Sequence, residues 1–510
     1  MGKMMKKFDF KNLFVLDLAN NHQGNLNHAE KIINDVGVVV KRRNVRAALK
    51  FQFRELDTFV HPDHKVGSPS KQIQRFLSTR LEYSDFEKLL TVVRDLGLIS
   101  ICTPFDEASV KAICDLKFDL IKVASCSARD WPLLEDIASS NLPVICSTGG
   151  LSLAEIDNVV SFFEHRMVDF ALMHCVSIYP TPKDKCNLNQ IDVMLKRYPG
   201  RVIGWSTHEN PALVSPIQIA VAKGAKMFER HVGVETENIK LNDYSSSPDH
   251  LDQWFTAYNE ALDLCGQRDR VAYAQEKESL DALRRGVYAK KRIKKGQTIH
   301  REEVFFALPF QEGQLASGHF KEGMIAAREI SGNEPLLISS IKIPPPPQVQ
   351  VIKDAVHEVK ALLNEAHITL SSEFEVEYSH HYGISNFRDH GAVIINCINR
   401  DYCKKIVAQL PNQKHPAHYH KLKEETFQIL HGILHLTRDG HERTFYPGET
   451  CLVMPGVWHS FWTDIGCVFE EISTTHHNTD SIYADQAINS MPRKARKTIV
   501  DHWGRYQLKC

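Results

Sequence analysis

Residues 98–125 read LISICTPFDEASVKAICDLKFDLIKVAS and hold the pattern that decides the fold. Two short apolar runs, Leu98–Phe105 and Leu120–Ser125, flank a segment whose apolar residues have helical spacing. Near-continuous hydrophobicity is typical of parallel strands that are buried on both faces. The stretch therefore predicts a strand, a helix and a second strand parallel to the first.

The same pattern recurs across the first 265 residues. The further apolar runs are Leu13–Ala19, Ala47–Phe53, Pro143–Gly149, Asp169–Val176, Val202–His208 and Lys226–Val232. With the first two runs they make eight, which is the strand number of a (β/α)8 barrel. The sequence therefore predicts an α/β fold of the TIM-barrel type, with a doubly wound open sheet as the alternative.

Nearly every apolar run ends in polar or reactive side chains. These are Asp17, Lys50 and Gln52, Thr103, Lys122 and Ser125, Ser147 and Thr148, His174, Ser206 and His208, and Glu229 and His231. Active sites of TIM barrels form at the carboxyl ends of the strands. This distribution therefore predicts an enzyme.

Composition limits the kind of protein. The chain has 510 residues, too many for one ordinary domain, and its 62 Lys and Arg balance 62 Asp and Glu. A neutral chain lacks the strong basic field of sequence-independent nucleic-acid binding, so we expect no nucleic-acid partner. No apolar run is long enough to span a membrane, and twelve cysteines without a CxxC pair favour a reduced, cytoplasmic location. The opening MGKMMKKF is interpreted as leading into a first strand and not as a signal peptide.

The chain divides into five predicted parts. They are a barrel at 1–268, a small β-rich module at 284–342, a proline linker at 343–348, a second β domain at 349–478 and a tail at 479–510. Consecutive prolines favour stiff polyproline II in the linker. From Gln348 onward, short strands, many turns and dense histidine predict β structure. A polar helix is predicted at Gln275–Arg285, and the basic stretch Met491–Tyr506 is interpreted as a solvated surface helix, with a binding arm as the alternative.

The second β domain contains a candidate metal centre. His418 and His420 are two residues apart, so their side chains share one face of a strand, while Glu425 and His459 follow later. Three imidazoles and a carboxylate suit a divalent transition metal (Fe, Mn, Ni, Zn or Cu); an accidental HxH in a histidine-rich chain is the alternative. The two segments resemble the motifs of the cupin superfamily, which implies a β-barrel. Met454 takes the usual proline position, and no ligand position changes.

The strand ends of the barrel predict a site for an anion beside a metal. His208 and His231 could hold one divalent ion, and Lys50 and Lys122 carry charges suited to phosphate and carboxylate. Hydroxyl donors accompany the lysines at Thr103, Ser125, Ser147 and Ser206. A core ion pair and a Schiff-base aldolase that uses Lys122 are the alternatives. The chemistry alone predicts a metal-dependent enzyme with a phosphorylated or acidic substrate.

A series of motifs resembles the sialic acid (N-acetylneuraminate) synthase family in order and spacing. The motifs are Asn21-His22-x-Gly24, Lys50-x-Gln52, Thr103-Pro104-Phe105, Lys122-x-x-Ser125, Ser147-Thr148-Gly149, His174-Cys175 with Ile178-Tyr179-Pro180-Thr181-Pro182, Ser206-x-His208 and Glu229-Arg230-His231. The module at 285–342 is similar to that family's antifreeze-protein-like SAF domain. The resemblance implies condensation of phosphoenolpyruvate with the open-chain aldehyde of a hexose-type sugar, which gives a 2-keto-3-deoxy nonulosonic acid and phosphate.

The resemblance also implies roles for individual residues. His208 and His231 would bind Mn²⁺ or Mg²⁺, and Asp17 stands where the family has a glutamate close to the reacting carbons. Phosphoenolpyruvate would be held by Lys50, Lys122, Thr103, Ser125, Ser147 and Ser206. The sugar would be lined by Gln52, Phe105, Tyr179 and Asn242. A homodimer in which the SAF module contacts the partner barrel is implied as well.

Three departures from the family concern the sugar side. Ser127 replaces a glutamate, Asn242 replaces an aspartate, and Leu308 replaces the SAF arginine that meets the N-acyl group. The reaction type is therefore expected to persist with a different sugar, because unmatched polar contacts discriminate strongly between substrates. The alternative is a catalytically decayed barrel that serves as a sugar-binding or regulatory protein, with the cupin as its active module. The cupin could also isomerise the sugar or bind the product.

Overall fold

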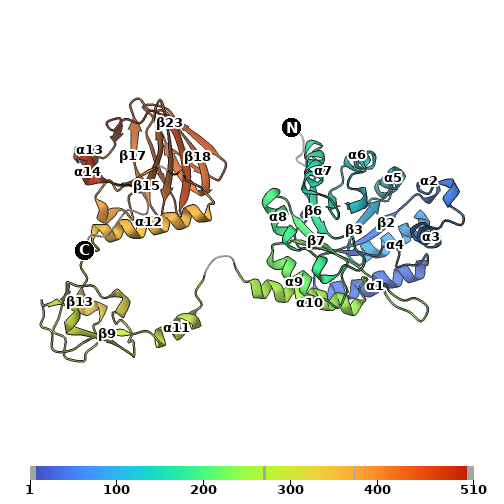
Figure 1. Cartoon of the computed structure of the whole chain (residues 1–510), viewed down its shortest axis with the longest axis horizontal. Coiled ribbons are helices and arrows are strands. Elements are labelled where there is room, and N and C mark those ends of the chain that lie inside the picture. Colours follow the sequence, from blue (N-terminus) through green and yellow to red (C-terminus); the bar gives the residue numbers. More distant parts are fainter. Residues whose placement is uncertain (1–6, 268–270, 371, 373, 502–510) are drawn as a thin grey trace. The chain divides into compact units, whose positions relative to one another are not determined.

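The computed structural model describes residues 7–267, 271–370, 372 and 374–501, and divides into two compact units at Arg270. The first unit is a closed barrel of eight parallel strands in chain order (Figure 1). Its strands are β1 (Leu13–Asp17), β2 (Ala47–Phe53), β3 (Ile99–Pro104), β4 (Leu120–Val123), β5 (Val144–Ser147), β6 (Phe170–Cys175), β7 (Ile203–Thr207) and β8 (Met227–His231). All eight predicted strands are confirmed, and the barrel replaces the alternative of an open sheet.

Helices surround the barrel strands. They are α1 (Leu26–Arg43), α2 (Leu56–Phe59), α3 (Lys71–Ser78), α4 (Tyr83–Asp95), α5 (Glu107–Asp115), α6 (Trp131–Ser139), α7 (Leu153–His165), α8 (Asn189–Arg197), α9 (Ser215–Ala222) and α10 (Pro248–Cys265). Side-chain caps fix where several of them begin. Asp106 accepts a hydrogen bond from the Ser109 amide at the start of α5, and Ser152 with Glu155 forms a capping box on α7.

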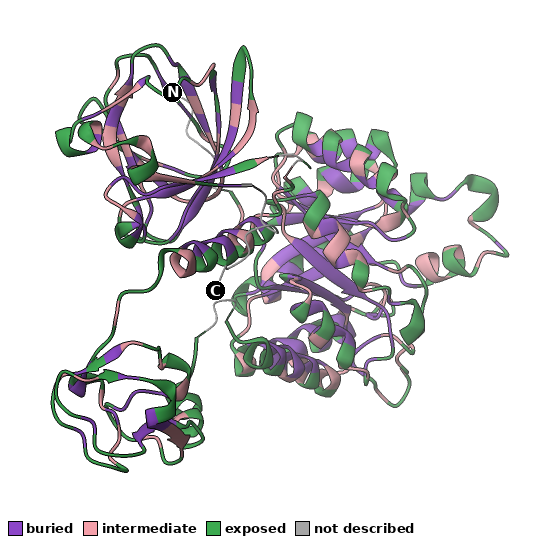
Figure 2. Cartoon of the chain, turned by 60° about the vertical axis from the view of Figure 1, so that its left-hand side comes forward, coloured by how far each residue is buried: buried purple, intermediate pink, exposed green. Residues whose placement is uncertain are grey.

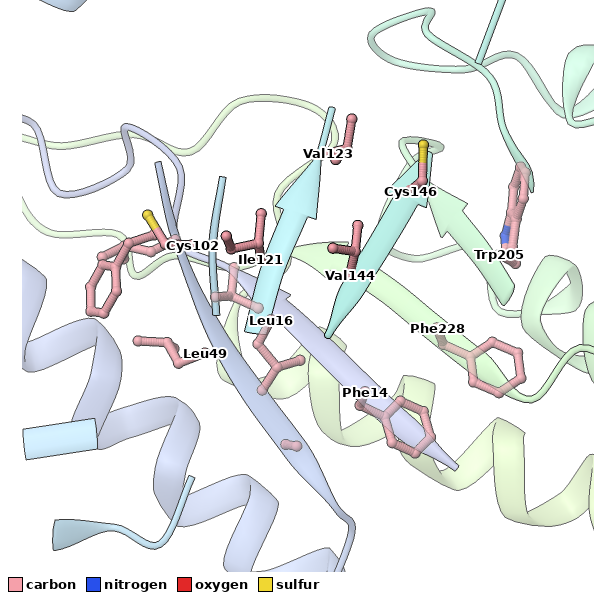
Figure 3. Close-up of a cluster of buried hydrophobic side chains, with 14 of the residues drawn as sticks. Phe14, Leu16, Leu49, Cys102, Ile121, Val123, Val144, Cys146, Trp205 and Phe228 are labelled. Carbon is pink, nitrogen blue, oxygen red and sulfur yellow. The ribbon is translucent and has the colours of Figure 1, made fainter. Parts of the chain in front are cut away.

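Alternation along each strand separates two apolar layers. Phe14 and Leu49 point away from the barrel axis and pack under the helices, as Figure 3 shows. Their neighbours Leu13, Val15 and Ala48 belong to a second cluster inside the barrel. Successive strand side chains point to opposite faces, so the inward positions near the carboxyl ends are the ones left free for polar groups.

The second unit begins with α11 (Ala274–Ala282) and a small β-rich module. The strands of the module are β9 (Gly286–Ala289), β10 (Thr298–Ile299), β11 (Val304–Ala307), β12 (Met324–Ala326) and β13 (Ile341–Lys342). Its own core contains Val287, Ile293 and Leu336, all fully buried. Both the predicted polar helix and the predicted small β module are therefore present.

Two antiparallel sheets make the rest of the second unit. One has the order β21-β18-β23-β16-β15-β14-β25 and the other β20-β19-β22-β17-β24. The strands are β14 (Glu375–Ser379), β15 (Ala392–Asn399), β16 (Tyr402–Gln409), β17 (Lys414–His420), β18 (Glu425–Gly432), β19 (Leu434–Arg438), β20 (His441–Phe445), β21 (Thr450–Val453), β22 (His459–Trp462), β23 (Cys467–Thr474), β24 (Ser481–Tyr483) and β25 (Lys497–Asp501). This agrees with the predicted β-rich region.

Two elements of this region differ from the prediction. Residues 348–365 form helix α12 (Gln348–Glu365) and not strands, because Ile352, Val356 and Val359 make an apolar stripe that packs against the sheet. In the tail, Lys497–Asp501 pairs with β14 as strand β25 and is not helical. Only the short helices α13 (Gln486–Ser490) and α14 (Arg493–Arg496) precede it, and positions 502–506 of the predicted helix lie outside the described residues.

Burial follows the strands in both units, while the outer faces of the helices are exposed (Figure 2). Leu16 of β1 and Val393 of β15 are completely buried, whereas Val38 of α1 is 62% exposed. In the described part of the chain, no helix has the length and apolar character that crossing a membrane requires.

Candidate active site and metal centre

A cavity of about 540 Å³ opens at the carboxyl ends of the barrel strands. Twelve predicted site residues line it: Asp17, Lys50, Gln52, Thr103, Phe105, Lys122, Ser125, Ser147, Tyr179, Ser206, His208 and His231. The strand register explains the convergence, because Asp17 pairs with both Lys50 of β2 and His231 of β8. Inward-pointing positions at one level of a barrel face each other.

A buried charge cluster occupies the floor of this cavity. Lys50 Nζ lies 3.0 Å from Asp17 Oδ2 and also forms an ion pair with Glu229, while Lys122 Nζ lies 3.4 Å from Glu229 Oε2. Burial opposes the charge of Lys50, but Asp17 and Glu229 outweigh it and raise the pKa of the ammonium group. Burial likewise opposes the charge of Glu229, and Lys122 and Lys50 outweigh it and lower its pKa. Lys50 and Glu229 are therefore both charged, and each lysine of the cluster has a carboxylate partner.

Hydrogen-bond donors surround the ammonium group of Lys122. Lys122 Nζ donates to Ser147 Oγ at 2.6 Å, and the Gly149 amide donates to Ser125 Oγ at 2.9 Å. A Cβ at Gly149 would lie 2.5 Å from Ser177 Oγ, so only glycine allows the backbone this close. Thr103 Oγ1 is buried and makes no hydrogen bond to any residue that the structure describes. Hydroxyls beside a buried ammonium suit the oxygens of phosphate or carboxylate.

Two imidazoles line the same cavity, and His231 Nδ1 lies 3.4 Å from Asp17 Oδ2 of the charge cluster. The ring centroids of His208 and His231 are 5.3 Å apart. His208 Nδ1 lies 3.0 Å from the Val176 carbonyl oxygen, which can only accept, so Nδ1 carries the proton and Nε2 keeps its lone pair. Burial and the neighbouring His231 lower the pKa of His208 to about 3. Burial also lowers the pKa of His231. Neutral imidazoles with a free ring nitrogen fit a divalent metal ion.

The residues predicted for the sugar have different places. Gln52 donates to Asp17 Oδ2 at 3.1 Å, and the Tyr179 ring centroid lies 4.2 Å from that of His208. Asn242 lies outside the cavity lining and donates to Asn21 Oδ1 at 3.3 Å. Its contact with substrate therefore stays a prediction.

The cavity also contains side chains that the sequence analysis did not select. They include Arg54, Arg75 and Tyr244, together with Glu229, to which the sequence assigns no role in binding or catalysis. Glu229 could have been found because it lies two residues before His231 on the same strand, so both side chains point into the barrel. Arg75 lies on α3, in the connection after β2, and no periodic pattern in the sequence brings it to the cavity.

The second metal candidate lies between the two antiparallel sheets. His418, His420 and His459 could hold a metal ion. Each offers one ring nitrogen, and these three nitrogens lie within 4.8 Å of one another. His418 Nδ1 and His459 Nδ1 face the carbonyl oxygens of Pro416 and Val457 at 3.0 and 3.1 Å, which leaves both Nε2 atoms free. Carbonyl partners of this kind orient metal-ligating histidines.

Glu425 completes this arrangement. Its Oε1 lies 3.3 Å from His420 Nε2, and its Oε2 lies 3.3 Å from His459 Nε2. The carboxylate thus lies beside the Nε2 atoms of two of the three histidines. Lys423 forms an ion pair with Glu425 and with Glu471, and lowers the pKa of Glu425 against the effect of burial. The donor set fits a divalent transition metal.

Comparisons with known proteins agree with this architecture. Residues 43–269 match the NeuB family and residues 406–464 match the cupin domain. A solved structure of a putative spore coat polysaccharide biosynthesis protein E from Chromobacterium violaceum is 40% identical, with a TM-score of 0.63, and the match covers 65% of this chain and all of that one. N-acetylneuraminate-9-phosphate synthase of Drosophila melanogaster is 32% identical over 42% of this chain and 59% of its own length. N,N'-diacetyllegionaminic acid synthase of Campylobacter jejuni is 26% identical over 62% of this chain and 93% of its own.

A closed parallel barrel that gathers lysines, hydroxyls and imidazoles at its carboxyl-terminal face defines a barrel-type enzyme site. The chain belongs to the NeuB family through this barrel and carries a cupin domain after it. The similarity of residues 284–342 to a SAF domain stays a prediction.

Proposed function

We propose that the barrel condenses phosphoenolpyruvate with the open-chain aldehyde of a hexose-type sugar, giving a 2-keto-3-deoxy nonulosonic acid and phosphate. The observation that carries the proposal is that one cavity is lined both by Lys122 with its neighbouring hydroxyl groups and by the imidazoles of His208 and His231. Relatives that bear the names of N-acetylneuraminate-9-phosphate, legionaminic acid and pseudaminic acid synthases support it.

Atoms balance with one water per turnover. C3 of phosphoenolpyruvate forms a bond to the aldehyde carbon, water adds at C2, and the bond from C2 to the phosphate oxygen breaks. The water supplies the new carbonyl oxygen; one of its protons goes to the former aldehyde oxygen, and the other leaves with the phosphate. A divalent Mn²⁺ or Mg²⁺ bound by His208 and His231 would supply Lewis-acid chemistry at the aldehyde.

The residues of the chain have separate tasks in this proposal. Lys50 and Lys122 hold the phosphate and carboxylate by charge, and Thr103, Ser125, Ser147 and Ser206 supply hydrogen bonds to their oxygens. Asp17 contacts Lys50 and Gln52 and faces His231, so it orients groups beside the reacting carbons. Gln52, Phe105 and Tyr179 line the sugar, and Asn242, which donates to Asn21, is predicted to contact it.

The test is phosphate release that depends on phosphoenolpyruvate, on added metal and on an aldose, with mass detection of a product three carbons longer than the sugar. Lys122→Met should abolish release, while Lys111→Met on the exposed face of α5 should leave it unchanged. Borohydride treatment with substrate should leave no adduct on Lys122. A trapped adduct would favour the Schiff-base aldolase, and an inactive wild-type barrel would favour the sugar-binding protein.

We further propose a homodimer in which the module at 284–342 contacts the barrel of a partner copy, and a divalent transition metal (Fe, Mn, Ni, Zn or Cu) held by His418, His420, Glu425 and His459. Truncation after Ile343 should leave a dimeric and active synthase, because stiff prolines separate it from the cupin domain. Sedimentation of the truncated chain tests the dimer, and a fully active monomer would contradict it.

A further inference from the structure

Two arginines line the barrel cavity without a carboxylate partner. Arg54 follows β2 and Arg75 lies on α3. Among the described residues, no carboxylate lies within ion-pair distance of either guanidinium group. The four cations of the lining outnumber its two carboxylates, and those two are already paired with the lysines. The arginines are therefore the uncompensated positive charge of the cavity.

The guanidinium of Arg54 is held in a fixed position. Its Cζ lies 3.7 Å from the ring centroid of Phe105 and 4.0 Å from that of Phe76, so the group is clamped between two aromatic rings. Nη2 donates to Gln52 Oε1 at 3.1 Å, and Nε is buried without a hydrogen bond. Burial lowers the pKa of Arg54 to about 10, which is still well above neutral pH. A buried cation with an unused donor is costly unless a ligand supplies the anion.

The contacts of the arginines locate them on the acceptor side. Gln52 and Phe105, both assigned to the sugar, are the direct neighbours of Arg54. Arg75 directly precedes Phe76, whose ring contacts the Arg54 guanidinium, and both residues line the same cavity. The donors assigned to phosphoenolpyruvate cluster instead around Lys122 and Ser147.

We propose that Arg54 and Arg75 form an anion-binding subsite for the acceptor, and that the acceptor is an aldose with a phosphate or carboxylate group at the end away from its aldehyde. This inference rests on the proposed condensation for its placement. A guanidinium is a planar fork of donors that matches phosphate and carboxylate oxygens. The arginines determine which acceptor sugar binds and take no part in forming the carbon–carbon bond.

Matched sugars test the proposal on the full-length protein. Phosphate release is measured with mannose, mannose 6-phosphate and mannuronic acid, and with N-acetylmannosamine and its 6-phosphate. We expect kcat/KM for an anionic sugar to exceed that of its neutral partner at least tenfold. Comparing mannose 6-phosphate with mannuronic acid shows whether the subsite prefers a phosphate or a carboxylate. Equal or better use of both neutral sugars would overturn the proposal.

Substitutions test whether Arg54 and Arg75 cause the preference for anionic over neutral sugars. Arg54→Gln with Arg75→Gln should reduce the anionic preference to near one and leave the KM for phosphoenolpyruvate within twofold. Lys71→Gln is the matched control, because it removes one positive charge from the same helix α3 outside the cavity lining. An unchanged preference in the double variant, or a raised KM for phosphoenolpyruvate alone, would contradict the proposal. Arg75→Gln alone provides the same comparison without altering the buried Arg54.

A binding measurement separates this inference from the proposed reaction. Calorimetric titration with mannose 6-phosphate and with mannose requires no turnover, and only the former should bind measurably to wild type. The double variant should lose that binding, and Lys71→Gln should keep it. If no sugar supports phosphate release but this pattern of binding holds, the condensation fails and the anion subsite stands. Equal binding to wild type and the double variant would overturn the subsite.

Discussion

The barrel cavity and the cupin pocket are both buried sites rich in lysine and histidine, yet they differ in space and in charge pairing. The barrel cavity measures about 540 Å³ and retains two unpaired arginines. The cupin pocket measures about 40 Å³, and its Lys405, Lys423 and Glu471 are joined in ion pairs. The larger volume and the arginines without an ion-pair partner support the proposed binding of an anionic substrate in the barrel. The cupin pocket has little free space, and its three histidines could hold a metal ion.

The largest effect is expected from a substitution at the proposed metal site of the barrel. His231→Ala should abolish condensation, with a loss of about a thousandfold or more, because removing a metal ligand removes several kcal/mol of charge stabilisation. Folding should be retained, since the His231 side chain packs at the cavity and not in the apolar layers. Phosphate release in metal-supplemented buffer is the measurement, with far-UV circular dichroism as the control. Retained turnover would contradict the metal role.

The stability of the second unit should depend on pH through one buried carboxylate. Glu377 of β14 is buried with Lys497 and Arg493, which outweigh the effect of burial and lower its pKa from 4.5 to about 2. A lowered carboxylate pKa stabilises the fold fully above pH 4.5, and this stabilisation is lost as the pH falls toward 2. The full contribution is about 3 kcal/mol, at roughly 1.4 kcal/mol per pKa unit.

Glu377→Gln should therefore lower the free energy of unfolding at pH 7 and flatten its decline between pH 5 and 3. Urea unfolding at a series of pH values measures both effects, and the transition of the second unit is the one that should move. Glu442→Gln on exposed strand β20 is the matched control. Parallel pH curves for wild type and Glu377→Gln would show that Glu377 does not titrate as described.

The eight barrel strands could be predicted because burial on both faces leaves a continuous apolar run. Eleven of the twelve cavity residues could be predicted because they lie at the ends of those runs, whereas Tyr179 lies three residues beyond its run and is implied only by the family resemblance. Arg75 could not, since its approach depends on how the segment after β2 folds back over the cavity. Helix α12 departs from the predicted strands although Ile352, Val356 and Val359 have helical spacing, because the turns and dense histidine from Gln348 onward favour β structure for the whole region. Strand β25 pairs with β14, which lies over a hundred residues earlier, and local sequence carries no trace of such a partner.

The choice of sugar gives a smaller expected effect. Leu308, which is 54% exposed, takes the position where the resemblance places an arginine that meets an N-acyl group. A carbonyl left without a partner on burial costs about 1–3 kcal/mol. N-acetylmannosamine should therefore be used roughly ten- to hundredfold less well than the preferred sugar. Values of kcat/KM for N-acetylmannosamine, mannose and 6-deoxy di-N-acetyl hexoses test this, and Leu308→Arg should narrow the difference. N-acetylmannosamine as the clear best substrate would refute the argument.

The smallest effect on condensation is expected from the cupin. His418→Ala with His459→Ala removes two of the three imidazoles that could hold a metal ion, so the purified chain should lose one metal equivalent in elemental analysis. Phosphate release with saturating sugar should stay within twofold of wild type, because the barrel has its own imidazoles, cations and donors in one cavity. His441→Ala at the exposed start of β20 is the control and should change neither quantity. If condensation falls in parallel with the metal, the charge-paired pocket is part of the synthase, and the two sites cannot be treated as independent.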